Sequence, residues 1–112
     1  MIEKTVRDFL AAKLDPVPVY LEIPSNPPTK HVFVEKTGSR ELEYITTTTF
    51  AIQSNDDSLY HASVLNETIK ELFVDILENE EICSFSKNTD YPFPDADRKS
   101  YRYQLVVEIT HY

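Results

Sequence analysis

The stretch ITTTTFAIQSNDDSLYHASVLNETIKELFVDILENE, residues 45–80, decides the fold that this sequence predicts. It begins with an apolar and threonine-rich run, 45–54, whose four consecutive β-branched threonines favour the extended backbone of a strand. The polar run 55–58 then supplies side-chain oxygens that can cap the start of a long helix, predicted over 59–80. A strand followed by an amphipathic helix indicates a sheet with one face covered by helix.

The predicted helix 59–80 carries its apolar residues at intervals of three and four, which places them on one face. These residues are Ala62, Leu65, Ile69, Leu72, Phe73, Ile76 and Leu77. A shorter stripe of the same kind over 2–14 predicts a first helix, which Pro16 stops because the residue before a proline is pushed out of the helical region. The sequence therefore predicts two helices that each bury one face.

Alternation of apolar and polar residues predicts strands over 17–23, 31–35, 45–54, 82–87 and 101–110. Pro18 and Pro24 lack a backbone donor, which places the first strand at or near a sheet edge. The residues expected to face inward are Val19, Leu21, Phe50, Ile52, Leu105, Val107 and Ile109, with Tyr101 and Tyr103 on the same inner face. We therefore predict one α+β domain, residues 1–112, with an antiparallel, mostly meandering sheet of about five strands and two helices packed on one face.

Reactive side chains do not cluster in this sequence. With one glycine, Gly38, neither a G-x-G-x-x-G motif nor a P-loop can be written. The three histidines fall on different predicted elements without metal-ligand spacing, and the lone Cys83 is expected to be a small buried residue. The acid pairs 56–57, 80–81 and 95–97 fall at helix ends or in a loop, where carboxylates stay solvated. We predict no catalytic residue, no metal site, no cofactor and no enzymatic activity.

The formal net charge of −8 argues against any broad contact with a phosphate backbone. A single cysteine excludes an internal disulfide, and the charged first residues lack the apolar run of a signal peptide. No stretch reaches the length of about 18 apolar residues that a membrane span needs. These features lead us to expect a soluble protein made in the cytoplasm, with no nucleic-acid specificity and no membrane association.

Two segments are candidates for contact with another protein surface. The predicted loop 88–100 holds two aromatic residues that alternate with two prolines, and aromatic residues are enriched at protein interfaces. The charged stretch 40–43 offers the mixed charges that can fix the register between neighbouring copies. The predicted interface residues are Arg40, Glu41, Glu43, Asp90, Tyr91, Phe93, Asp95, Asp97, Arg98 and Lys99.

Short phrases along the whole chain resemble one family of proteins. They are IEKTV at 2–6, IPSNPP at 23–28, FVEKTG at 33–38, TTFAIQS at 48–54, SLYHA at 58–62 and YRYQLVVEI at 101–109. In this order they resemble small phage and prophage proteins of the tail-completion class, the tail terminator or head-to-tail joining proteins of long-tailed phages.

This resemblance implies a non-enzymatic structural protein of the virion, assembled in the host cytoplasm. It implies a ring, commonly a hexamer, that caps the tail tube and joins it to the head connector, so that the tube and connector proteins are its partners. Six copies, each with a charge of −8, would carry −48, and an acidic lumen would repel passing DNA. Two other functions stay open: a small acidic protein-binding adaptor or inhibitor, and an enzyme whose site combines Cys83 with a distant histidine.

Overall fold

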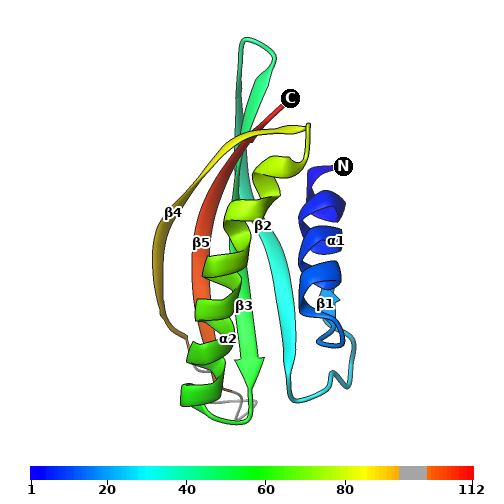
Figure 1. Ribbon diagram of the computed structural model, residues 1–112, viewed down its shortest axis with the longest axis vertical. Helices are drawn as coiled ribbons and strands as arrows, with labels where there is room; N and C mark the ends of the chain where they lie inside the picture. The colour runs from blue at the N-terminus through cyan, green and yellow to red at the C-terminus, as the bar shows by residue number, and fades with distance from the viewer. Residues whose placement is uncertain (94–100) are drawn as a thin grey trace.

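The chain follows the predicted order of a helix, three strands, a helix and two strands (Figure 1). The computed structural model describes residues 1–93 and 101–112. Its elements are α1 (Ile2–Leu14), β1 (Val19–Tyr20), β2 (His31–Leu42), β3 (Ile45–Asp56), α2 (Leu59–Leu72), the 3-10 helix η1 (Phe73–Glu78), β4 (Ile82–Pro92) and β5 (Tyr101–His111). The α+β class and the five strands are confirmed.

The strands form one sheet in the order β1-β2-β3-β5-β4. Three of the neighbouring pairs are antiparallel, as predicted, but β1 runs parallel to β2, with Val19 opposite Val32. The prediction of an antiparallel sheet is therefore wrong at this edge, and the sheet is mixed. The physical reason is segment 21–30, which carries the chain back so that β2 starts at the same end as β1. The position of β1 at the sheet edge is confirmed.

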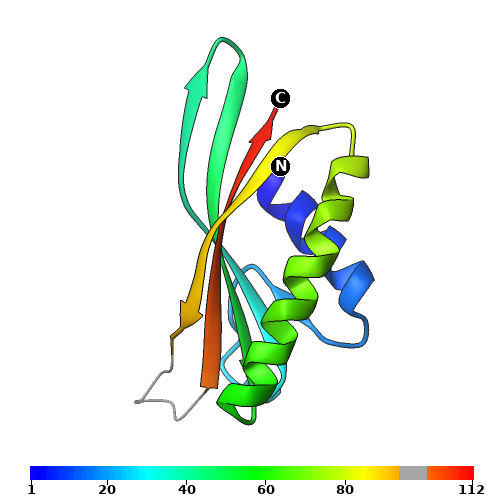
Figure 2. The ribbon, with the colours of Figure 1, turned by 60° about the vertical axis from the view of Figure 1, so that its left-hand side comes forward.

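The two helices contact different parts of the sheet. α1 contacts β1 and β2, whereas α2 contacts β3 and β5. Figure 2 shows that the outer part of the β2–β3 hairpin projects beyond both helices, which makes the molecule 44 Å long and only 24 Å across. The predicted covering of one sheet face is therefore confirmed only in part, because neither α1 nor α2 covers the hairpin's outer part.

The core lies between the helices and the part of the sheet that they cover. Of the seven residues predicted to face inward, six are buried: Val19, Phe50, Ile52, Leu105, Val107 and Ile109. Leu21 lies just beyond β1 and is half-buried against this core. Tyr101 is 46% exposed, so its predicted burial is wrong. It occupies the last register position of β5, opposite Asp56, where the sheet ends.

The second helix is shorter than predicted. α2 ends at Leu72, and the chain continues as η1. A 3-10 helix has 3.0 residues per turn, so the apolar stripe of the α-helix shifts out of phase. Phe73 and Ile76 stay buried, but Leu77 is exposed and Leu72 is half-buried. Across residues 1–93 and 101–112, no helix has the length and apolar character that crossing a membrane requires.

Two strands are longer than predicted by five residues or more, whereas β3 and β5 extend only two residues and one residue past their predicted ends. β2 runs to Leu42, so Arg40 and Glu41 belong to the strand, and the register against β3 shifts between Lys36 and Gly38. β4 runs to Pro92, so the first part of the predicted loop 88–100 is strand. Backbone pairing with β5, which places Asp90 opposite Leu105, extends β4 beyond its apolar residues. The remainder of that loop, 94–100, lies outside the described residues.

Candidate functional site

The outer part of the β2–β3 hairpin, residues 37–48, is the most exposed feature of the molecule, and we call it the hairpin arm. Its tip carries Leu42, which is 76% exposed, and Tyr44, which is 90% exposed. Arg40 is also exposed on the arm, and its guanidinium lies 3.9 Å from a carboxylate oxygen of Glu108 on β5. A projecting arm with apolar residues at its tip is a surface suited to contact with another molecule.

The turn at the tip of the arm has an unusual backbone. Glu43 and Tyr44 both have positive φ, 50° and 70°, as in the two-residue turn that best matches the twist of a hairpin. That turn normally holds Asn-Gly or Asp-Gly, because other residues are strained at positive φ. Glu43 and Tyr44 therefore occupy this turn at an energetic cost.

Asp90, one of the predicted interface residues, is half-buried where the end of β4 meets α2. Its carboxylate accepts hydrogen bonds from Asn66 Nδ2 at 2.9 Å and from Lys70 Nζ at 3.3 Å, both on α2. Hydrogen bonds to Glu67 and to Asp90 raise the pKa of Lys70. Asp90 thus ties the end of β4 to the helix, which is a structural role.

Tyr91 and Phe93 do come together on the surface, as their proposed role requires. Their rings meet edge to face, with centroids 6.2 Å apart, and the Arg102 guanidinium lies 4.4 Å from the Phe93 centroid. The Tyr91 hydroxyl accepts a hydrogen bond from Gln104 Nε2 at 2.6 Å. This aromatic cluster lies at the opposite end of the sheet from the hairpin arm, so the two predicted interface segments do not form one surface. The predicted residues Asp95, Asp97, Arg98 and Lys99 lie outside the described residues.

Cys83 is exposed, which contradicts its predicted burial. It lies in the irregular start of β4, where the register shifts between Ile82 and Ser84. His111 pairs with Ile82 across the sheet, but its Nε2 is hydrogen-bonded to the Thr48 hydroxyl at 2.8 Å and its Nδ1 to the Tyr112 carbonyl at 3.1 Å. Both ring nitrogens of His111 are therefore engaged and do not serve Cys83 as a base in this structure.

A group of three titratable residues stands at the start of α2. The ligand atoms of Asp56, Asp57 and His61 lie within 4.8 Å of one another. The hydrogen bond between Asp57 and His61 lowers the pKa of Asp57 and raises that of His61. Ser58, within the predicted capping run, is the N-cap and accepts from the His61 backbone N–H. Asp57 and His61 are exposed, and the group stands at the positive end of a helix, which disfavours a cation there.

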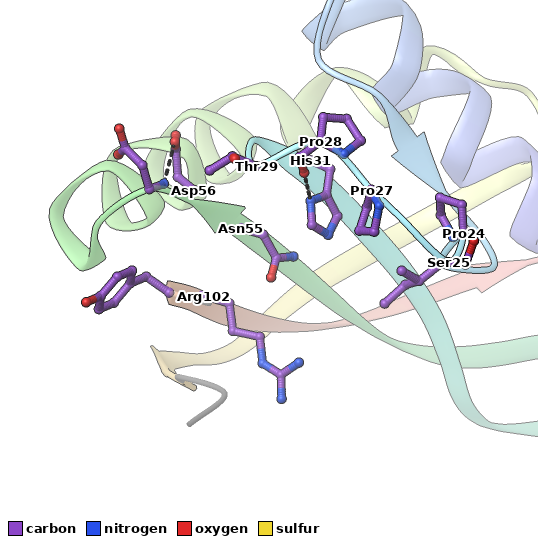
Figure 3. A pocket seen from close by; sticks show the side chains of 12 residues that line it. Pro24, Ser25, Pro27, Pro28, Thr29, His31, Asn55, Asp56 and Arg102 are labelled. Carbon is purple, nitrogen blue, oxygen red and sulfur yellow. Dashed lines mark hydrogen bonds between the residues drawn. The ribbon is translucent and has the colours of Figure 1, made fainter. Parts of the chain in front are cut away.

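A pocket of about 820 Å³ lies at the end of the sheet opposite the hairpin arm (Figure 3). Segment 23–29 forms one wall, and the ends of β2, β3 and β5 form the floor and the far rim. The sequence analysis did not predict this pocket, because it assigned Asn55 only to the capping run 55–58 and gave the proline-rich segment no part in a site. The register of β2 against β3 brings His31 and Asn55 opposite each other.

No protein-family model matches this chain, and no curated protein is significantly similar to it. The resemblance to tail-completion proteins therefore stays a prediction. We therefore argue the function of the protein from its exposed surfaces.

Proposed function

We propose that this protein is a non-enzymatic structural component of a phage or prophage tail. In this proposal, identical copies form a ring that caps the tail tube and joins it to the head connector. The hairpin arm is the observation that carries the proposal. The link to phage tails comes from the short sequence segments that resemble tail-completion proteins. The hairpin arm is the surface through which copies would make contact.

The apolar residues at the tip of the arm take no part in the core of their own subunit. The tip places Leu42 and Tyr44 in solvent beyond the helices, and large apolar side chains exposed in this way favour burial against another protein. Burying two such side chains stabilises a contact by about 1.5–3 kcal/mol each. An arm that reaches across to the next subunit would use this free energy for assembly.

The sheet has two different outer edges, which suits a head-to-tail contact. Within the described residues, β4 lies at one edge, and β2 beyond Phe33 forms part of the other, because β1 pairs only with Val32 and Phe33. Contact between two different surfaces is heterologous, and it closes into a ring when the rotation between copies divides a full turn evenly. Both edges carry lysines and register shifts, which oppose indiscriminate strand pairing.

The acidic surface agrees with this role. Carrying 19 acidic and 11 basic residues, each copy repels DNA, so a ring through which DNA passes stays non-adhesive. The predicted interface residues Arg40, Glu41 and Glu43 lie on or beside the arm, whereas Tyr91 and Phe93 lie at the other end of the sheet. The aromatic cluster is therefore suited to a second contact, made with the tube or the connector.

Complementation of a phage that lacks this gene tests the proposal. The host supplies either the native protein or the variant Leu42→Ser/Tyr44→Ser, and infectious particles are counted while tails are inspected by electron microscopy. We expect the double variant to reduce the yield at least a hundredfold and to leave tails unjoined to heads. Tyr60→Ser, which changes another largely exposed tyrosine, on α2, is the matched control and should complement normally.

Normal particle yield with the arm variant would contradict the proposal. Normal yield in the complete absence of the gene would contradict it more fundamentally. Circular dichroism of each purified variant shows whether its fold is retained, and exposed positions of this kind seldom change stability by more than about 0.5 kcal/mol.

A further inference from the structure

A groove lies between the two helices. α1 contacts β1 and β2, whereas α2 contacts β3 and β5, so the helices stand over different strands. The space between the end of α1 and residues 61–68 of α2 forms the groove, and we call it the interhelical groove. Its volume of about 450 Å³ falls within the range of sites that hold small ligands.

Part of the groove is apolar. Leu14 and Leu65 line it and belong to the core, and Val17 is packed against that core. Val64 also lines the groove, but it is 46% exposed. An exposed valine beside core residues offers an apolar surface that another protein can cover.

The charged side chains that line the groove are mostly cationic. They are Lys13, Lys30, His61 and Asp56. Lys30 Nζ lies 4.0 Å from the Asp56 carboxylate, and Lys13 Nζ lies 3.4 Å from that of Asp75, which is outside the groove. Exposed ion pairs of this kind contribute little to stability, and each ammonium has three donors. Both lysines can therefore bind a further carboxylate.

The start of α2 adds to this preference for anions. His61, which lines the groove, is paired with Asp57, which does not. The backbone N–H groups at a helix start carry partial positive charge, which attracts carboxylates and repels cations. The groove therefore suits a segment that combines apolar with acidic side chains.

The tip of the hairpin arm has this composition. Its sequence ELEY, residues 41–44, alternates acidic and apolar side chains. Leu42 and Tyr44 are the exposed apolar residues described above. Within residues 1–93 and 101–112, the carboxylates of Glu41 and Glu43 have neither an ion pair nor a hydrogen bond. The tip therefore gains both apolar burial and charge pairing in a groove of this kind.

The arm and the groove lie in different parts of the subunit. The arm projects past one end of the helices, whereas the start of α2 and the end of α1 lie towards the other end (Figures 1 and 2). The arm of one subunit therefore does not reach the groove of the same subunit. A contact between these two surfaces joins different copies and is heterologous, which is the kind of contact that a ring requires.

We propose that the interhelical groove binds the tip of the hairpin arm of a second copy of this chain. The inference rests on the proposed assembly into a ring, and it names the surface that the arm contacts. Leu42 and Tyr44 cover the apolar part of the groove, which includes Val64. Glu41 and Glu43 pair with Lys13 and Lys30.

Crosslinking between copies tests the proposal. The full-length protein carries Cys83→Ser, so that the native thiol cannot react, together with Ile45→Cys beside the arm tip and Thr68→Cys in the groove. A short bismaleimide joins cysteines that lie close together. We expect a ladder of covalent multimers in denaturing electrophoresis. The matched control replaces Thr68→Cys with Val74→Cys, which is 55% exposed but outside the groove, and should give no ladder.

Reversing the charges tests the pairing of carboxylates with lysines. Glu41→Lys/Glu43→Lys should slow crosslinking about tenfold, although it makes each copy less acidic and so reduces the general repulsion between copies. Adding Lys13→Glu/Lys30→Glu to the same chain should restore the rate. Adding Lys4→Glu/Lys36→Glu instead gives the same net charge from lysines outside the groove and should not restore it. Circular dichroism shows that each variant is folded.

Two results would overturn this inference while leaving the ring intact. One is a discrete oligomer in which Val74→Cys crosslinks as fast as Thr68→Cys, or in which neither does, because the arm would then contact another surface or another protein. The other is equal restoration by both pairs of lysine changes, because the copies would then respond only to net charge. A native protein that stays monomeric in light scattering would instead refute the proposed assembly, and this contact with it.

Discussion

At the start of α2, Asp57 and His61 hold each other in their charged forms. The hydrogen bond between them lowers the pKa of Asp57 below its usual 3.8 and raises the pKa of His61 above its usual 6.5. The raised histidine stabilises the fold below about pH 6.5, and this contribution is lost as the pH rises through its folded-state pKa. The lowered aspartate stabilises the fold above about pH 4, and this contribution is lost as the pH falls through its folded-state pKa. The pair acts fully between these limits.

Removing the carboxylate from this pair should change the titration of the histidine. We expect Asp57→Asn to bring the pKa of His61 down towards 6.5, measured by NMR titration of the imidazole protons. Asp8→Asn on α1 removes a similarly exposed carboxylate and should leave His61 unchanged. An unchanged His61 pKa in Asp57→Asn would show that the two side chains do not interact in solution.

At the scale of single elements, the turn of the hairpin arm combines strain with exposure. Glu43 and Tyr44 sit at positive φ, where a replacement by Asn-Gly relieves strain. The residue types that the turn prefers are therefore absent, while an exposed aromatic ring stands at the tip. This pattern is what we expect where a side chain is retained for contact at the expense of local stability.

The double change Glu43→Asn/Tyr44→Gly should therefore stabilise the isolated subunit, by about 1–2 kcal/mol in urea unfolding, since both positions have positive φ. The same change should impair assembly, because it removes the Tyr44 ring. A variant that is more stable and assembles normally would show that the ring at the tip has no role in contact.

The second element with a clear energetic role is α2. Ile69 is completely buried in the core, so Ile69→Ala should cost about 2–5 kcal/mol of unfolding free energy. Leu72 is only half-buried where α2 gives way to η1, so Leu72→Ala should cost less. Urea denaturation of both variants measures the difference. Equal losses would mean that the helix continues past Leu72 with its stripe facing the core.

Local sequence patterns predicted those strands whose apolar and polar residues alternate and those helices whose apolar residues recur at intervals of three and four. The alternation over 101–110 predicted β5, and the inward residues Leu105, Val107 and Ile109 are confirmed as buried. The end of β4 has no such alternation, and its pairing with β5 places it in the sheet, so tertiary context decided its structure. The pocket was not predictable for a related reason. His31 and Asn55 meet only through the register between two strands, and no spacing in the sequence encodes that register.

At the scale of the whole molecule, three surface features stand out. The hairpin arm projects from one end beyond the helices (Figures 1 and 2). The aromatic cluster and the pocket involve the opposite ends of β4 and β5 and of β2 and β3. If assembly uses the hairpin arm, the arm of one subunit has to contact a neighbouring subunit. The central claim is therefore that the protein associates with copies of itself into a closed ring.

The mass of the purified protein in solution tests this claim most directly. Size-exclusion chromatography with light scattering distinguishes a 13.0 kDa monomer from a closed assembly, which for six copies has a mass of about 78 kDa. We predict one discrete species of several copies, whose mass does not grow with protein concentration, and its loss in Leu42→Ser/Tyr44→Ser. A native protein that stays at 13.0 kDa at every concentration would contradict the ring and would favour a small acidic adaptor or inhibitor.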